Sequence, residues 1–199
     1  MKLFLKILGA IVLLLILIVA GFYVFINTTW NKSFADYPRP EIKASTDSAV
    51  IARGDYLVHA VAHCSICHQG GSSEFKSEKE IMEHRQSGVG QDLIGGHVWD
   101  IPLFGRFVTA NLTSDVETGI GGNSDGDVAR VIKNGVLRNG HMGAFMSLAA
   151  GPMADEDVIA VLSYLRTLKP VKQVNPLEAP GLMGKMVIKN IKPRDVHLK

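Results

Sequence analysis

The chain has 199 residues, a net charge of +2, 47% hydrophobic residues and only two cysteines. This length allows one domain of ordinary size with short additions, and two cysteines exclude a disulfide-rich scaffold. The charge is uneven: residues 1–29 carry +2, residues 30–170 carry −4 and residues 171–199 carry +4. A mildly acidic central part argues against a nucleic-acid partner, which would favour a basic surface.

An uncharged apolar run of twenty residues opens the chain, from Ile7 to Ile26. As a helix it would be about as long as the 30 Å hydrocarbon core of a bilayer is thick. A cleaved signal peptide is the alternative, but its apolar region is shorter and ends at a small-x-small cleavage site, which does not follow here. We therefore predict a single-pass anchor. Lys2 and Lys6 precede the run, so the N-terminus is expected in the cytoplasm and the rest of the chain outside.

Residues 30–47 hold two prolines and little periodicity, which is typical of a linker. The first predicted helix of the outer part follows, at residues 48–62. Its apolar residues Val50, Leu57 and Val61 recur at helical spacing, and Asp47 or Ser48 can cap its start. This helix would deliver its C-terminal end to Cys64.

Three further helices are predicted downstream. Residues 77–87 begin with a capping box, and residues 125–134 are capped by Ser124 and ended by Gly135. Residues 154–170 have acidic side chains in the first turn and one apolar face, formed by Val158, Val161, Leu162, Leu165 and Leu168. Residues 88–123 contain eight glycines and no sustained period. With no alternating pattern of useful length, the outer domain is predicted to be all-α, with too few large aliphatic residues for a self-sufficient core.

Both cysteines lie in one short stretch, HCSICHQ, which runs from His63 to Gln69. C-x-x-C-H is the sequence form of c-type haem attachment, in which two thioethers hold the porphyrin and the adjacent histidine ligates the iron. The motif predicts one covalently bound c-type haem (heme c), attached through Cys64 and Cys67, with His68 as the proximal ligand. The exported compartment and the incomplete core agree with this interpretation.

The two thiols allow two other interpretations. A thioredoxin-like redox pair follows a strand in a βαβ unit, whereas this motif follows a predicted helix. A structural zinc ion needs four ligands, so His63 or His59 would have to join His68 and both thiolates within one turn of chain. Haem explains the pattern better than either alternative.

The motifs also resemble those of a known family. ARGDYLVHAVAHCSICH (Ala52–His68) resembles the opening of class I cytochromes c. ANLTSDVETGIGG (Ala110–Gly122) and DEDVIAVLSYLRTLKP (Asp155–Pro170) resemble more narrowly the haem domains of cytochrome subunits of membrane-bound dehydrogenases. The resemblance covers residues 48–170. It implies a class I cytochrome c fold wrapped around one haem, with the first helix crossing the last closely near Gly54 and Tyr164.

The resemblance also implies a distal methionine ligand in the loop before the last helix. Met146, nine residues before Asp155, lies at the position expected for it; Met142 is the next candidate, and Met153 is expected to pack in the core. One departure is Ser147, because the family usually has proline after the ligand. His141 is a less favoured ligand, and His59, His63 and His84 are expected to be surface or packed imidazoles. Family members tend to contact the haem propionates at the positions of Trp99, Arg106 and Asn111.

These expectations describe an electron-transfer protein rather than an enzyme. Its parts would be an N-terminal transmembrane anchor (1–29), a linker (30–47), a haem domain (48–170) and a basic C-terminal tail (171–199), which would be solvated or lie against anionic lipid or an acidic partner. Residues 7–26 would cross the bacterial cytoplasmic (inner) membrane, with the haem domain on the periplasmic side. There it would carry single electrons between redox protein partners of a respiratory chain. The alternatives are a permanent relay subunit of a dehydrogenase or respiratory complex, and a haem enzyme or sensor with an open iron site.

Overall fold

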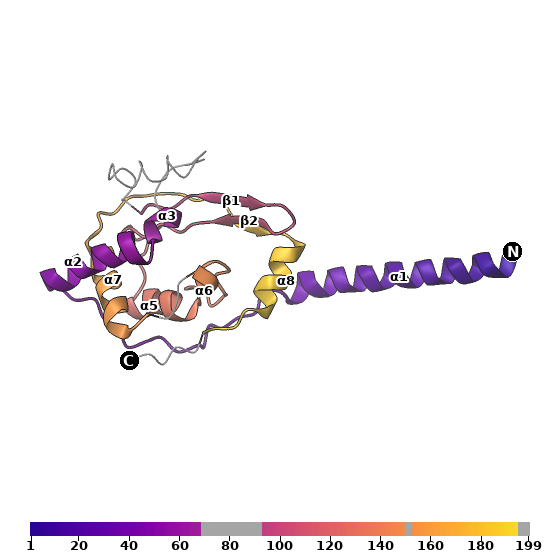
Figure 1. The fold of residues 1–199 in the computed structure, drawn as a ribbon, viewed down its shortest axis with the longest axis horizontal. Coiled ribbons are helices and arrows are strands. Elements are labelled where there is room, and N and C mark those ends of the chain that lie inside the picture. Colours follow the sequence, from indigo (N-terminus) through magenta and orange to yellow (C-terminus); the bar gives the residue numbers. More distant parts are fainter. Residues whose placement is uncertain (69–92, 150–152, 195–199) are drawn as a thin grey trace.

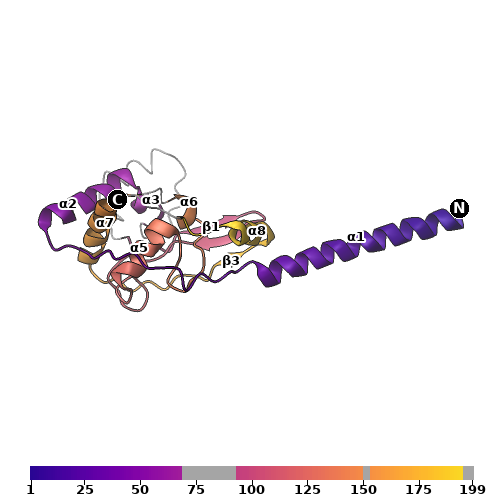
Figure 2. The ribbon, with the colours of Figure 1, turned by 90° about the horizontal axis from the view of Figure 1, so that it is seen from below.

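The computed structural model describes residues 1–68, 93–149 and 153–194. Helix α1 (Lys2–Thr29) projects away from the packed remainder of the chain, as Figures 1 and 2 show from two sides. It is long and apolar enough to cross a membrane, with a mean hydropathy of 3.1 over its most apolar part, none of which is buried in the protein. The apolar run thus forms one continuous helix, as predicted.

The helix before the cysteine motif begins where the sequence predicts. Asp47 is the cap: its carboxylate accepts hydrogen bonds from the backbone N–H groups of Ala49 and Val50. Helix α2 (Ser48–Tyr56) continues into a π-helical turn, η1 (Leu57–Val61), and the motif itself forms a short helix, α3 (Cys64–His68). His63, between them, has a positive φ of 51°, which turns the chain toward α3.

Two of the other predicted helices are confirmed. Helix α5 (Asp125–Asn134) is capped by Ser124, whose Oγ accepts from the Asp127 N–H, and ends at Gly135 with φ of 75°. Helix α7 (Asp155–Thr167) buries the predicted face, with Leu168 partly buried just after its end. Among the described residues, the sequence also did not predict the short helix α3 at the cysteine motif, nor α6 (Met146–Ala149) and α8 (Leu182–Asn190). The predicted helix at residues 77–87 lies outside the described residues.

The expectation of an all-α domain needs correction, although the chain is mostly helical. Strands β1 (Val98–Ile101) and β2 (Gly105–Val108) form an antiparallel hairpin, and β3 (Ala179–Pro180) pairs with β2. The strands are two to four residues long, too short to display an alternating pattern. Moreover, β3 reaches β2 from far along the chain, and such pairing has no local signal.

The segments expected to be linker and tail both pack on the rest of the chain. In residues 30–47, Phe34 donates its N–H to the Gly140 carbonyl, Arg39 pairs with Asp127 at 2.6 Å, and Ile42 is buried. After α7, the Val171 carbonyl accepts a hydrogen bond from Asn111, and the chain then forms β3 and α8. Both segments therefore help to hold the domain together.

Helices α2 and α7 cross closely, as the family resemblance implied. A Cβ atom on Gly54 would lie 1.9 Å from the Ala160 carbonyl oxygen and 2.8 Å from the Tyr164 Cβ. Only glycine allows such an approach without displacing the backbone. Next to it, the His59 Nε2 and the Tyr164 hydroxyl are 3.0 Å apart and hydrogen-bonded.

Within the described residues, the buried apolar side chains form two separate clusters. The first lies around α2, α5 and α7; the second joins the hairpin, the segment after α5 and helix α8. Cys64 packs against the first cluster, and Met142 belongs to the second. The cysteine motif and Met142, the second candidate for the distal ligand, therefore pack against different clusters.

Candidate haem-binding site

His68, the last residue of α3, is buried and held by one backbone contact. Its Nδ1 is 2.7 Å from the carbonyl oxygen of Ala110 and hydrogen-bonded to it. The carbonyl can only accept, so Nδ1 carries the proton, and Nε2 is left with the lone pair that a metal ion needs. Burial lowers the pKa of His68, against a smaller opposing effect of the Ala110 hydrogen bond, and favours this neutral form.

The cysteines lie on the same short helix as His68. Cys64 and Cys67 form no disulfide. Burial raises the pKa of Cys64 to about 11 and also raises the pKa of Cys67. Burial therefore favours the protonated thiol form of both cysteines.

These properties weaken the two alternatives. A redox-active C-x-x-C pair lowers the pKa of one thiol, whereas both pKa values are raised here. Among the described residues, no three His, Cys, Asp or Glu side chains gather at metal-binding distance. Residues 64–68 thus present one imidazole and two thiols rather than a four-ligand zinc site.

The three candidate methionines have different surroundings. Met142 is buried in the second apolar cluster, and its terminal methyl lies within 3.3 Å of where a Cβ on Gly135 would be. Met153 packs against the first cluster, as expected of a core residue. Met146, the first residue of α6, is only partly buried and belongs to neither cluster. The choice of Met146 as distal ligand stays a prediction, and the packing of the other two gives each of them a structural role.

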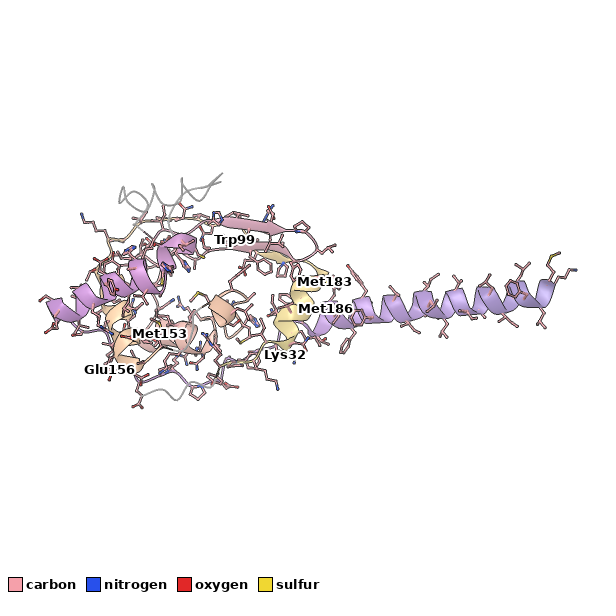
Figure 3. All side chains as sticks on the ribbon, in the orientation of Figure 1. Lys32, Trp99, Met153, Glu156, Met183 and Met186 are labelled. Carbon is pink, nitrogen blue, oxygen red and sulfur yellow. The ribbon has the colours of Figure 1, made fainter. Side chains whose placement is uncertain are left out.

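Trp99 supplies a test of whether the site suits a haem. Its indole Nε1 is buried and has no hydrogen-bond partner among the described residues. Buried donors are normally satisfied, so this orphaned N–H fits a site that is completed by an acceptor such as a propionate. Figure 3 labels Trp99 at the hairpin; the ring packs against Phe145, next to Met146, at 5.5 Å between centroids. The residues present therefore fit the group that the motif predicts.

The other two positions suggested for propionate contacts are already engaged. Arg106 is exposed and pairs with Asp100 across the hairpin at 3.0 Å. Asn111 is buried, and its amide donates to Thr118 and to the Val171 carbonyl while its oxygen accepts from Thr113. Asn111 therefore joins the loop of residues 111–118 to the segment after α7.

Two of the other histidines that the sequence analysis considered have partners within the protein. His59 bonds Tyr164, and His141 lies 3.1 Å from the Lys32 carbonyl. His63 is exposed at the turn before α3, while His84 lies outside the described residues. Sequence reasoning did not find Ala110 as the partner of His68, because a backbone acceptor 42 residues away leaves no side-chain signal.

Comparison with known proteins confirms the resemblance. The chain is similar to the cytochrome c subunit of a quinone alcohol dehydrogenase from Gluconacetobacter polyoxogenes, at 28% identity over 146 residues, 71% of this chain and 29% of that protein. It is likewise similar to the gluconate 2-dehydrogenase cytochrome c subunit of Pantoea cypripedii, at 29% identity over 70% of this chain and 31% of that protein. A third relative is the fructose dehydrogenase cytochrome subunit of Gluconobacter japonicus, at 30% identity over 58% of this chain and 21% of the relative.

No protein-family model matches the chain, and the chain spans less than a third of each of these three relatives. What these three relatives share is that each is named as the cytochrome subunit of a dehydrogenase. The expectation of an electron-transfer protein rather than an enzyme agrees with the names of these relatives.

Proposed function

We propose that this chain is a membrane-anchored monohaem cytochrome c that transfers single electrons outside the cytoplasmic membrane. The observation that carries the proposal is the buried His68 ring, oriented by the Ala110 carbonyl directly after two cysteines that form no disulfide. Cys64 and Cys67 would hold the haem by thioethers, and His68 and Met146 would ligate its iron. The haem supplies a one-electron ferric/ferrous couple.

The protein's own part is to hold both ligands in place. The hydrogen bond from Nδ1 fixes the tautomer and the plane of the His68 ring. A ligand set that is the same in both oxidation states needs little rearrangement during electron transfer, and a filled sixth position excludes substrate. Both features favour a carrier over a catalyst.

Between a free-standing carrier and a permanent relay subunit, we favour the subunit. The relatives are named as cytochrome subunits of alcohol, gluconate and fructose dehydrogenases. By this proposal α1 anchors the chain with its N-terminus inside, and the haem domain meets its donor and acceptor at the periplasmic face. In this proposal the anchor is residues 1–29 and the haem domain is residues 48–170, on which residues 30–47 and 171–194 also pack. Purification of the native membrane complex in mild detergent tests this choice: a copurifying dehydrogenase is expected, and a protein recovered alone would favour the carrier.

The ligand assignment is tested by Met146→Leu, with Met142→Leu as the matched control. Both changes replace thioether with hydrocarbon at similar volume, which usually costs less than about 1.5 kcal/mol. We expect Met146→Leu to abolish the low-spin spectrum of the oxidised protein and to allow the reduced protein to bind carbon monoxide, while Met142→Leu changes neither. If Met146→Leu keeps the low-spin spectrum, Met146 is not the ligand. Carbon monoxide binding by the unsubstituted reduced protein would support an open-site enzyme or sensor instead.

A further inference from the structure

Helix α8 and the turn between β1 and β2 present one apolar surface beside the end of α1. Four large apolar side chains on it are exposed: Leu103 (77%), Phe104 (39%), Met183 (39%) and Val187 (40%). Phe104, Met183, Met186, Val187, Asn190 and Ile191 line a groove of about 470 Å³ on the same surface. We call this surface the α8 face; it consists of Leu103 and the six residues that line the groove. Figure 3 labels Met183 and Met186 on it.

The turn and the helix form one unit. The N–H of Gly181 donates to the Phe104 carbonyl at 2.7 Å, and the N–H of Met183 donates to the Leu103 carbonyl at 3.3 Å. These bonds satisfy backbone donors that the start of a helix otherwise leaves free. A Cβ on Gly184 would lie 2.2 Å from the Phe104 carbonyl oxygen, so the helix touches the turn directly. The exposed apolar side chains are therefore displayed by a fixed scaffold.

Helix α8 is attached at the level where α1 stops being apolar. Lys185 Nζ donates to Asn27 Oδ1 at 2.6 Å, directly after the apolar run ends at Ile26. Lys189 Nζ donates to the Thr29 carbonyl at 3.2 Å and lies 4.3 Å from the centroid of the Phe25 ring. Cations at the C-terminal end of a helix complement its dipole, so these contacts set the position of α8 beside the membrane boundary of α1.

The orientation of α8 also suits a bilayer surface. Figure 1 shows α8 running across the end of α1 instead of continuing it, and in Figure 2 α8 is seen nearly end-on. A helix placed this way lies roughly along the surface of a membrane that α1 crosses. Its inner side, Gly184 and Ile188, is buried on the domain, while Met183 and Val187 face outward beside the two lysines. Apolar side chains flanked by lysine are typical of helices that lie in the membrane interface.

We propose that the α8 face rests in the interfacial layer of the same bilayer that α1 spans, and so holds the haem domain in one orientation against the membrane. The occupant is lipid, because the surface continues directly from a membrane-spanning helix. This inference rests on the anchoring part of the proposed function and is independent of the haem ligands.

The test is photolabelling of the full-length, haem-loaded protein in phosphatidylcholine vesicles that contain a phosphatidylcholine with a diazirine in its acyl chain. Mass spectrometry locates the lipid adducts. We expect adducts on the segments that contain Leu103–Phe104 and Met183–Val187, as well as on α1. Val116 is an internal negative control: it is 69% exposed, in a loop whose Ser114 contacts the C-terminal end of α7, away from α1.

A double variant, Leu103→Glu with Val187→Glu, should lose the adducts on both segments and keep those on α1, with an unchanged haem spectrum. Val116→Glu is the matched control and should keep the full pattern. Adducts on α1 alone in the unsubstituted protein would overturn the proposal and leave the α8 face to a protein partner. Adducts that persist in the double variant would also overturn it. Absence of adducts from α1 would instead contradict the membrane anchor itself.

Discussion

The ring of His68 is oriented by a hydrogen bond to the backbone. The Ala110 carbonyl occupies Nδ1, so the ring presents Nε2. The imidazole is buried, so its orientation is held by packing as well as by this hydrogen bond. The sequence predicts that His68 is a ligand. The fold places the Ala110 carbonyl where it orients the His68 ring.

Asp127 lies between charged side chains of different elements. Burial alone would raise its pKa, but hydrogen bonds from Ser124 and Arg39 and the charge of Arg39 outweigh this and lower it. Arg130, itself fully buried, lies 3.6 Å from the same carboxylate. A carboxyl with a lowered folded-state pKa stabilises the fold above its ordinary pKa of 3.8, and this contribution is lost as the pH falls toward the lower folded value.

We therefore expect Asp127→Asn to be less stable than the unsubstituted protein near neutral pH and to lose less stability on acidification. Urea unfolding followed by circular dichroism, from about pH 6 to about pH 3, measures both effects. Asp36→Asn, an exposed aspartate of the 30–47 segment, is the control and should keep the original pH dependence. If the free energy of unfolding falls equally with decreasing pH in Asp127→Asn and in the unsubstituted protein, the Asp127 carboxylate does not stabilise the fold in this way.

At the scale of elements, helices α2 and α7 cross in close contact at Gly54. This contact depends on Gly54, because a Cβ there would lie 1.9 Å from a backbone oxygen that cannot rotate away. Gly54 of α2 thus lies directly against Ala160 and Tyr164 of α7.

Gly54→Ala is expected to destabilise the domain by about 1–3 kcal/mol, the usual cost of overpacking, despite the better helix propensity of alanine. Thermal unfolding, followed by circular dichroism, measures the loss. Gly9→Ala makes the same substitution in α1, where nothing lies within 4 Å, and should leave the domain unchanged. An unchanged melting temperature for Gly54→Ala would show that the helices can separate at no cost.

For the whole molecule, the segment after α7 joins parts that are distant in sequence. The Val171 carbonyl accepts hydrogen bonds from Asn111 and Thr113, both buried. Farther on, Ile188 belongs to the second apolar cluster, and Arg194 donates to the Ile132 carbonyl. A segment that the charge distribution marked as a basic tail is therefore part of the packed domain.

A chain that ends at Pro170 should accordingly be less stable by several kcal/mol, since it leaves buried polar groups without partners, at about 1–3 kcal/mol each, and uncovers apolar surface. Urea unfolding of the haem-loaded protein in detergent measures this. A chain that ends at Arg194 keeps every contact described above and is the control. Equal unfolding midpoints for the two chains would mean that residues 171–194 add nothing to the fold.

Features that depend on neighbouring residues can be predicted from the amino-acid sequence. The uncharged run predicts α1, the caps at Asp47 and Ser124 predict where α2 and α5 begin, and C-x-x-C-H predicts the attachment of a haem. These signals are local, since helix periodicity, capping and motif spacing act over a few residues.

Which distant segments meet becomes visible in the folded chain. The Ala110 carbonyl on His68, the pairing of β3 with β2 and the seating of α8 on the end of α1 join residues that are 42 to about 160 positions apart. Such contacts form because packing and hydrogen bonding must be satisfied in the whole fold. Strands of two to four residues are too short for their sequence to indicate which strand they pair with.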